Sequence, residues 1–225
     1  MTKKQRTAAI IQALARTYPT AHCELVFANP LQLLVATILS AQCTDKRVNL
    51  VTETLFEHYR SAEDYARTSQ EELEEAIHST GFYRNKAKNI RAMAADLVAK
   101  HHGQVPETME ELVVLAGVGR KTANVVLGNA FGKNEGVVVD THVARLSHRL
   151  GLTRATTPEK IEQELMKLVP RKDWTNFSHW LIWHGRRRCT ARNPDCAGCE
   201  VVALCPSAFT FGKPAPAKKP ATTAG

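Results

Sequence analysis

Residues 112–123 read LVVLAGVGRKTA: an apolar run, two glycines around one valine, and a second run that favours helix. We expect a short helix, a tight turn at Gly117 and Gly119, and a second helix beginning at Arg120, because glycine adopts backbone conformations closed to other residues. The amide N–H groups of such a turn and of the following helix point outward together and can bind a phosphate. A site of this kind contacts a nucleic acid backbone and not its bases. The alternative is a hairpin that needs both glycines only for its geometry.

Helical patterns extend on both sides of this hairpin. Apolar residues recur at helical spacing, and Ser, Thr or Asn precedes many of the expected helix starts. Residues 31–41 are apolar on every side, which predicts a central buried helix. Residues 136–139 favour an extended conformation but have no partner strand, which leaves no nucleotide-binding sheet. The sequence predicts an all-α protein of about ten helices, over residues 3–18, 31–41, 44–59, 69–81, 84–101, 108–115, 120–131, 140–150, 157–169 and 174–184, with a short helix after Ser61.

The composition is that of a globular protein. The chain has 225 residues, of which 44% are hydrophobic and 23% charged, and this excludes wholesale disorder. The formal net charge is +8, and residues 171–225 hold nine Lys and Arg against three Asp and Glu. A basic end favours a polyanionic partner, nucleic acid first and a membrane surface second. Solubility alone is the alternative explanation of this charge.

The cysteines point to a metal site. No signal peptide is evident, and the longest apolar run, 33–39, is too short to span a membrane, so we expect a cytoplasmic protein, in which disulfides are rare. Four of the six cysteines, Cys189, Cys196, Cys199 and Cys205, are spaced Cys-x6-Cys-x2-Cys-x5-Cys. Four thiolates on one short loop can hold a tetrahedral ion such as zinc or an iron–sulfur cubane. Cys23 and Cys43 are expected in the core.

The hairpin and the segment VDTHV at 139–143 together resemble a known family. The aspartate lies 19 residues after the hairpin lysine, as in the helix-hairpin-helix, Gly/Pro-Asp superfamily of DNA repair glycosylases, and the resemblance is closest to its endonuclease III family. It covers roughly residues 5–206 and includes LSAQCTD at 39–45 and GFY at 81–83. Ala116 departs from the proline usual in the family but leaves the backbone donors of the hairpin in place. The resemblance implies a bifunctional DNA glycosylase and abasic-site lyase that removes oxidised pyrimidines in base excision repair.

Lys121 and Asp140 are the candidate catalytic residues. A lysine acts as a nucleophile when its unprotonated amine is held against an electrophile. From the residues alone, Lys121 could equally contact phosphate or be solvated, and Asp140 could simply cap a helix. The resemblance implies that Lys121 attacks the sugar C1′ of a flipped nucleoside, the base leaves, a Schiff base forms, and loss of a 2′ proton cleaves the strand by β-elimination. It also implies that Asp140 stabilises positive charge on the sugar and assists deprotonation of Lys121.

Further DNA contacts follow from the resemblance. Gln42 and Phe82 hold the positions that fill the gap left by a flipped nucleotide. Phe82 is unusual, since the family commonly has an aliphatic residue there; it could stack on bases as a wedge or be buried in the core with Tyr83. His142 and Arg192 are candidate phosphate contacts, and their alternatives are packing after the cap and a solvated basic rim.

The resemblance also implies the cofactor and the domains. The cysteine spacing matches the family's [4Fe–4S] loop, in which the cluster braces the loop, and zinc is the weaker alternative. Residues 23–133 would form a six-helix barrel ending in the hairpin motif, and residues 1–22 with 134–206 a cluster domain. Double-stranded DNA with damaged pyrimidines or abasic sites would bind between the two domains. Residues 207–225 are expected to form a mobile basic tail rich in Pro, Ala and Lys.

Two other functions are alternatives to the glycosylase and lyase. An adenine-mismatch glycosylase of the same superfamily usually lacks this lysine and carries an extra C-terminal domain. A non-catalytic iron–sulfur DNA-binding protein is disfavoured by the presence of both Lys121 and Asp140. We therefore expect a monomeric repair enzyme that acts on the nucleoid and has no membrane partner.

Overall fold

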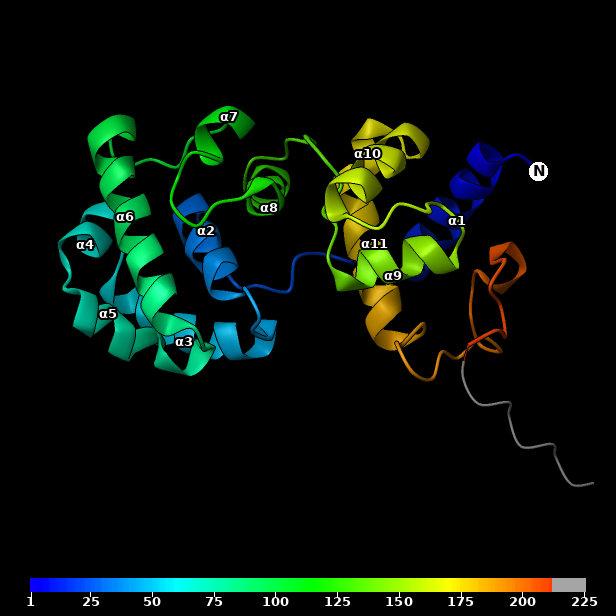
Figure 1. Ribbon diagram of the computed structural model, residues 1–225, viewed down its shortest axis with the longest axis horizontal. Coiled ribbons are helices and arrows are strands. Elements are labelled where there is room, and N and C mark those ends of the chain that lie inside the picture. The colour runs from blue at the N-terminus through cyan, green and yellow to red at the C-terminus, as the bar shows by residue number, and fades with distance from the viewer. Residues whose placement is uncertain (212–225) are drawn as a thin grey trace, which may run out of the picture.

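The computed structural model describes residues 1–211 and shows two helical lobes side by side (Figure 1). Residues 1–211 contain no strand, so the all-α prediction is confirmed, and residues 136–139 belong to no helix or strand. The elements are α1 (Lys3–Thr17), α2 (Pro30–Leu39), α3 (Asp45–His58), α4 (Ala62–Arg67), α5 (Gln70–Ile77), the 3₁₀ turn η1 (His78–Thr80), α6 (Tyr83–His101), α7 (Met109–Leu112), α8 (Arg120–Ala130), α9 (Thr141–Arg149), α10 (Pro158–Leu168), η2 (Arg171–Asp173), α11 (Trp174–Arg187) and η3 (Val202–Leu204).

Helix starts follow the predicted caps. The side chains of Asn29, Thr44, Ser61, Ser69 and Thr157 each accept a hydrogen bond from a backbone N–H in the first turn of the following helix. Such caps satisfy donors that the helix itself leaves unpaired. These local interactions explain why most helix starts could be placed from the sequence.

Two helices end earlier than expected. The helix predicted over 69–81 ends at Ile77 and continues as the 3₁₀ turn η1, and the helix predicted over 108–115 is a single α-turn that ends at Leu112. After Leu112, tight i→i+3 bonds follow instead, from Leu115 N to Leu112 O and from Val118 N to Leu115 O. This tightening buries Leu112 and Leu115 while Val114 stays 74% exposed, and it turns the chain toward α8.

The first lobe is built around α2. Every residue from Leu33 to Leu39 is buried, as predicted for a central helix. The hydrophobic core around α2 runs from Leu25 to Leu127 and takes side chains from α3 to α8. The last turn of α2 therefore lies inside the protein, where its carbonyl groups need donors from other elements.

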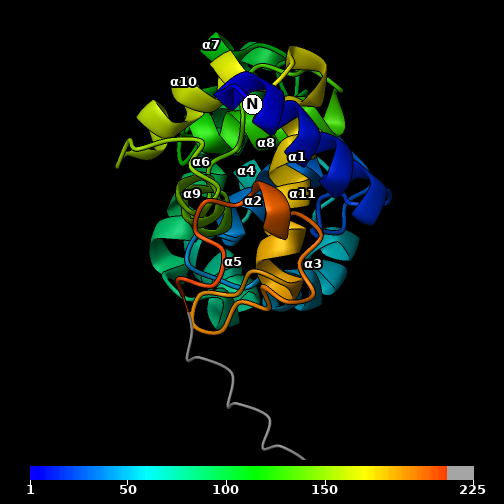
Figure 2. The same cartoon turned by 90° about the vertical axis from the view of Figure 1, so that its right-hand side faces the viewer.

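The second lobe joins the two ends of the chain. Helix α1 packs with α9, α10 and α11, and their side chains form a second hydrophobic core that extends from Ile10 to Val201. Figures 1 and 2 both show α1, in blue, beside the yellow helices of the second lobe. The connection 131–140 runs from α8 in the first lobe to α9 in the second, so the hairpin lysine and Asp140 come from different lobes.

A buried carboxylate ties the lobes together. Glu162 on α10 is 6% exposed and accepts hydrogen bonds from Arg120 Nε at 2.9 Å and from Asn124 Nδ2 at 2.8 Å, both on α8. Gly136 passes so close that a Cβ there would lie 2.0 Å from Glu162 Oε1. Removing the Arg120 charge would be costly, because the Glu162 carboxylate would stay buried without its ion-pair partner.

The loop after α11 carries the four clustered cysteines. Residues 207–211 continue along this loop, since the Phe209 N–H lies 3.4 Å from Cys196 Sγ and the Arg149 guanidinium lies 4.5 Å from the centre of the Phe211 ring. Residues 212–225 of the predicted tail lie outside the described residues. Over residues 1–211, no helix has both the length and the apolar character that crossing a membrane requires.

Candidate functional site

A cleft of about 290 Å³ opens between the two lobes. Lys121, Asp140 and Gln42 all line it, although they come from α8, the start of α9 and the loop after α2. The other lining residues include Ser178, His179 and Arg186 of α11. The fold thus brings together three residues that the sequence analysis selected on separate motifs.

Lys121 lies in the first turn of α8, directly after the hairpin. Its side chain is exposed, and within residues 1–211 it makes no hydrogen bond or ion pair. Its neighbour Arg120 is held by Glu162 in a two-point ion pair, with Nε–Oε2 at 2.9 Å and Nη2–Oε1 at 3.0 Å. The side of α8 next to Lys121 is therefore anchored, while the lysine amine remains available in the cleft.

The two hairpin glycines have different roles. Gly117 has φ +76°, a conformation that favours glycine, and an added Cβ would lie 2.9 Å from Asn89 Cβ. Gly119 has φ −89° and caps α8, and a Cβ there would meet open space. The alternative of a hairpin that needs both glycines for its geometry therefore applies to Gly117 and not to Gly119. Because Gly119 has no side chain, the N-terminus of α8 can be approached from outside the protein.

Replacing Gly117 by alanine should weaken binding to all DNA duplexes alike. The substitution forces an L residue into left-handed backbone and against Asn89, so the turn must shift and its amide donors move. We expect a loss of at least about tenfold in affinity, the equivalent of one or two hydrogen bonds. Fluorescence anisotropy with several unrelated duplexes measures it.

Gly119→Ala is the matched control for this prediction. Its Cβ meets no protein atom within 4 Å, so the folded state should keep its stability. Any loss of affinity in Gly119→Ala then reports close approach of DNA to residue 119. Full affinity in Gly117→Ala would show that the hairpin is not the phosphate anchor.

Asp140 caps α9, as the alternative to a catalytic role predicted. Its Oδ1 accepts the Val143 N–H at 2.7 Å, and this is the only hydrogen bond of its side chain within residues 1–211. The second carboxylate oxygen, Oδ2, has no such partner there, and Asp140 lines the cleft. A cap and a catalytic role therefore use different atoms of the same carboxylate and do not exclude each other.

Gln42 and Phe82 occupy strained, exposed positions. They have φ of 53° and 48°, and Phe82 is 64% exposed. The alternative that Phe82 is buried with Tyr83 is therefore wrong. Side chains other than glycine hold left-handed backbone only where the surroundings enforce it, and such positions cluster at functional sites.

His142 and Arg192 lie outside the cleft lining. His142 Nδ1 lies 3.2 Å from Arg145 Nη2, and a Cβ on Gly185 would approach His142, so the ring packs between α9 and α11. Burial lowers the pKa of His142, and the nearby Asp140 charge opposes this shift. Arg192 is exposed on the cysteine loop, with no side-chain hydrogen bond within the described residues. Neither residue therefore shares the cleft lining with Lys121.

Two residues of α11 complete the cleft and were not predicted. His179 lies within 2.8 Å of Asn129 Oδ1, and burial lowers its pKa to about 4, so it stays neutral at pH 7. Arg186 forms ion pairs with Asp45, at 2.7 Å, and with Glu24 across the lobe junction. No sequence motif identifies His179 or Arg186, because their hydrogen-bond and ion-pair partners lie 50 or more positions away along the chain.

The four clustered cysteines line one cavity. None of them forms a disulfide within residues 1–211, and apolar side chains such as Leu146 and Val201 complete the walls. Nitrogen donors approach the sulfurs: Arg149 Nη1 lies 3.3 Å from Cys189 Sγ, and the Phe209 N–H lies 3.4 Å from Cys196 Sγ. Four cysteines around one cavity, with N–H donors near their sulfurs and an apolar wall, fit a thiolate-bound metal centre.

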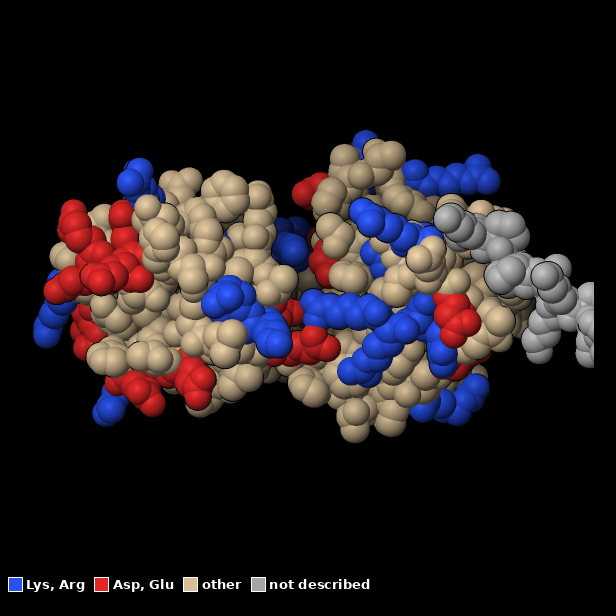
Figure 3. All heavy atoms as spheres, turned by 90° about the horizontal axis from the view of Figure 1, so that it is seen from below, with Lys and Arg blue, Asp and Glu red and all other residues tan. Residues whose placement is uncertain are grey.

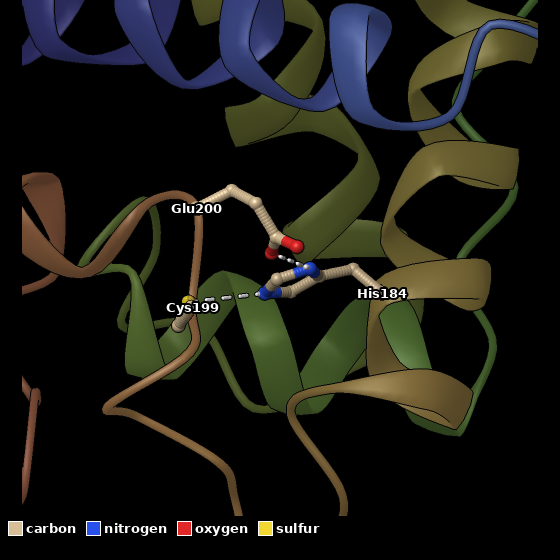
Figure 4. Close-up of side chains that lie close together, drawn as sticks. All are labelled: His184, Cys199 and Glu200. Atoms are coloured by element: carbon tan, nitrogen blue, oxygen red, sulfur yellow. Dashed lines mark hydrogen bonds and ion pairs between the residues drawn. The ribbon is translucent and has the colours of Figure 1, made fainter.

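His184 belongs to the same region. Figure 4 shows its ring between Cys199 and Glu200, with Nε2 3.4 Å from the Cys199 sulfur and Nδ1 3.8 Å from a Glu200 oxygen. Nδ1 also lies 3.0 Å from the hydroxyl of Tyr18, the residue that follows α1. These three side chains could themselves hold an ion, but the ring is already bonded on both sides. We interpret His184 as a hydrogen-bond partner of Cys199.

Charge is unevenly distributed over the surface. Seen from below, Lys and Arg side chains gather on the second lobe near the junction and on the adjoining edge of the first lobe, with Asp and Glu side chains between the two groups at the junction (Figure 3). Asp and Glu side chains concentrate at the outer end of the first lobe in the same view. Basic groups on both sides of the junction attract a polyanion to this face.

Comparisons with known proteins agree with this geometry. Residues 35–171 match the family described as HhH-GPD superfamily base excision DNA repair protein. The chain is 58% identical to endonuclease III of Synechocystis sp. over 206 residues, covering 92% of this chain and 94% of the relative. A non-covalent endonuclease III–DNA complex superposes with a TM-score of 0.88 at 46% identity, covering 93% of this chain and 98% of the other. A trapped covalent endonuclease III–DNA intermediate gives the same TM-score and identity, covering 93% and 99%.

Proposed function

Since the chain belongs to the HhH-GPD superfamily of base excision DNA repair proteins, and within it to the endonuclease III family, we propose that it is a bifunctional DNA glycosylase and abasic-site lyase. Its substrates in this proposal are oxidised pyrimidines and abasic sites in double-stranded DNA of the nucleoid. The observation that carries the proposal is the cleft between the lobes, which is lined by Lys121, Asp140 and Gln42 together.

The target nucleotide must first leave the base stack. Flipping costs a few kcal/mol, and less for damaged pairs, which contributes to selectivity. Gln42 and Phe82 are exposed on two loops and are proposed to fill the space that the nucleotide vacates. The hairpin amides at Gly117 and Gly119 are proposed to hold the backbone beside the lesion, with His142 and Arg192 as further phosphate contacts.

Lys121 then acts as the nucleophile. Its Nζ lone pair forms a bond to C1′, and the damaged base leaves with the electron pair of the glycosidic bond and takes up a proton. Breaking the C1′–O4′ bond gives the Schiff base. Loss of a proton from C2′ then expels the 3′ phosphate, and water releases the lysine. Neither an oxidant nor a reductant is needed for these steps, and no carboxylate within residues 1–211 ties up the amine.

Asp140 serves this chemistry from the other lobe. Its negative charge stabilises the positive charge that develops on the sugar as the base departs. Oδ2 can take the proton that Lys121 must lose, because Oδ1 is engaged with the Val143 N–H. The cap holds the carboxylate at the cleft wall while the second oxygen acts on the substrate.

We propose a [4Fe–4S] cluster held by Cys189, Cys196, Cys199 and Cys205. The four sulfurs line one cavity, and Arg149 and His184 supply N–H groups toward them, as thiolate ligands require. Burial raises the pKa of the Cys199 thiol to about 11, so metal binding must displace a proton there. When bound, the cluster would connect the four thiolates, and its proposed role is to stabilise the loop after α11.

Cys199→Ser should lose the cluster and most of the soluble protein. A structural metal contributes its binding free energy to folding, and this ligand is packed against His184. Purified wild type should be yellow-brown, with broad absorption near about 400 nm from thiolate-bound iron. Cys23→Ser, outside the loop, is the matched control and should keep the colour. One zinc and no iron by metal analysis would overturn the assignment.

We further propose that the two hydrophobic cores correspond to two domains, residues 23–133 and residues 1–22 with 134–206. The cores are separate, and each takes its side chains from one of these sets. This division explains why the catalytic lysine and aspartate meet only across the junction. DNA would then bind across both domains.

A panel of duplexes, each with a single lesion, tests the function. Wild-type protein should excise thymine glycol, nick the strand at the same position, and become covalently trapped when borohydride reduces the Schiff base. A duplex with an undamaged pyrimidine is the control. Binding to lesion DNA without trapping or nicking would favour the non-catalytic DNA-binding protein instead.

A further inference from the structure

Lys86 is a buried lysine that the proposed chemistry does not use. Lys86 is only 4% exposed, and it forms no ion pair within residues 1–211. Burial lowers its pKa. A buried ammonium group is costly unless its N–H groups are bonded, so its partners identify what it does.

Both partners of Lys86 are backbone carbonyls at the ends of helical segments. Nζ donates to Leu39 O and to Thr80 O, each at 2.8 Å. Leu39 is the last residue of α2, and Thr80 is the last residue of η1. Carbonyls at such ends have no intrahelical partner and carry partial negative charge, which a cation satisfies.

Gln42 and Phe82 lie on the two chain segments that directly follow Leu39 and Thr80. Gln42 follows Leu39 by three residues, and Phe82 follows Thr80 by two. Residues 1–211 contain four non-glycine residues with positive φ, and two of them are Gln42 and Phe82. The Phe82 carbonyl itself accepts the first backbone hydrogen bond of α6, from the amide of residue 86 at 3.1 Å, and this bond does not depend on the lysine side chain. The Lys86 ammonium thus bonds the carbonyls that precede both strained positions.

We propose that Lys86 is the positioning residue that holds Gln42 and Phe82 at a fixed separation for insertion into the duplex. This inference rests on the proposed function, in which these two side chains fill the gap left by the flipped nucleotide. Both side chains are exposed, so packing does not fix them, and their positions depend on the backbone. Two loops joined through one ammonium group enter the duplex as a single unit, which lowers the entropy lost on insertion.

Lys86→Met tests the proposal, because methionine fills the same space but donates no hydrogen bond. Lys100→Met is the matched control: Lys100 lies at the opposite end of α6, is exposed, and pairs with Asp96. Lys86→Arg keeps the charge and the donors and should restore part of any loss. It is also the second variant if Lys86→Met melts below the assay temperature.

Four measurements separate positioning from general stability. In Lys86→Met without DNA, amide hydrogen exchange should accelerate in residues 40–44 and 81–83, but not in α8. Single-turnover excision of a paired thymine glycol should fall at least about tenfold, the equivalent of one lost charge-assisted hydrogen bond. Cleavage at a preformed abasic site, where no base has to be displaced, should change less than about threefold. A 2-aminopurine beside the lesion should also show a smaller fluorescence rise on binding.

The outcomes are distinguishable. Unchanged exchange in both segments, or equal losses on the paired lesion and the abasic site, would overturn the proposal and leave Lys86 a structural residue. If wild-type protein neither excises nor becomes trapped, the proposed function fails. In that case the exchange comparison still decides whether Lys86 holds the two loops.

Discussion

Lys121→Ala should bind lesion DNA, yet give no borohydride-trapped adduct and no strand break. The Schiff base needs an amine at C1′, and Lys121 is the lysine that lines the cleft between the lobes. Removing the nucleophile abolishes the covalent step, so the loss should reach the detection limit of the assay. Affinity should largely survive, because the hairpin amides belong to the backbone. Gel analysis after reduction measures the adduct, and anisotropy measures the binding.

Lys133→Ala is the matched control for this loss. Lys133 follows α8, is 41% exposed at its side chain, and pairs with Glu107 at 2.9 Å, outside the cleft lining. It should be trapped like wild type. An adduct of normal yield with Lys121→Ala would mean that a different amine carries the reaction, and peptide mapping of the adduct would identify it.

Asp140→Asn should slow base excision by about 100-fold or more while costing little stability. The amide oxygen of asparagine can still accept the Val143 N–H that Asp140 Oδ1 accepts at 2.7 Å, so the cap of α9 is kept. The negative charge is lost, and with it the stabilisation of the sugar cation and the proton acceptor for Lys121. Single-turnover kinetics and urea unfolding measure the two effects separately.

Two further variants decide between the roles of Asp140. Asp140→Ala removes both cap and charge and should add a stability loss of about 1 kcal/mol. Thr157→Ala removes the cap of α10, away from the cleft, and should cost similar stability with normal turnover. Near-normal excision by Asp140→Asn would leave Asp140 as a cap and nothing more.

The helices were predictable because their causes are local. A cap such as Asn29 bonds a backbone group three residues away, and the apolar stripe of a helix repeats within one or two turns. The buried character of α2 was likewise readable from seven successive residues without a charge. The helix ends near Ile77 and Leu112 were misplaced because the packing of η1 and of the hairpin, and not the local pattern, ends those helices.

The sequence alone determined the cysteine spacing, the Gly-Val-Gly hairpin and the separation of Lys121 from Asp140, because each lies within one short segment or at a fixed distance along the chain. Only the tertiary structure decided that Gln42 joins them in one cleft, and that Phe82 is exposed. Lys86 reaches 47 residues back to Leu39, and Arg120 reaches 42 residues forward to Glu162. Such contacts leave no periodic signal, because their geometry exists only once α2, α6, α8 and α10 have packed, and a buried charge finds its partners in that packing.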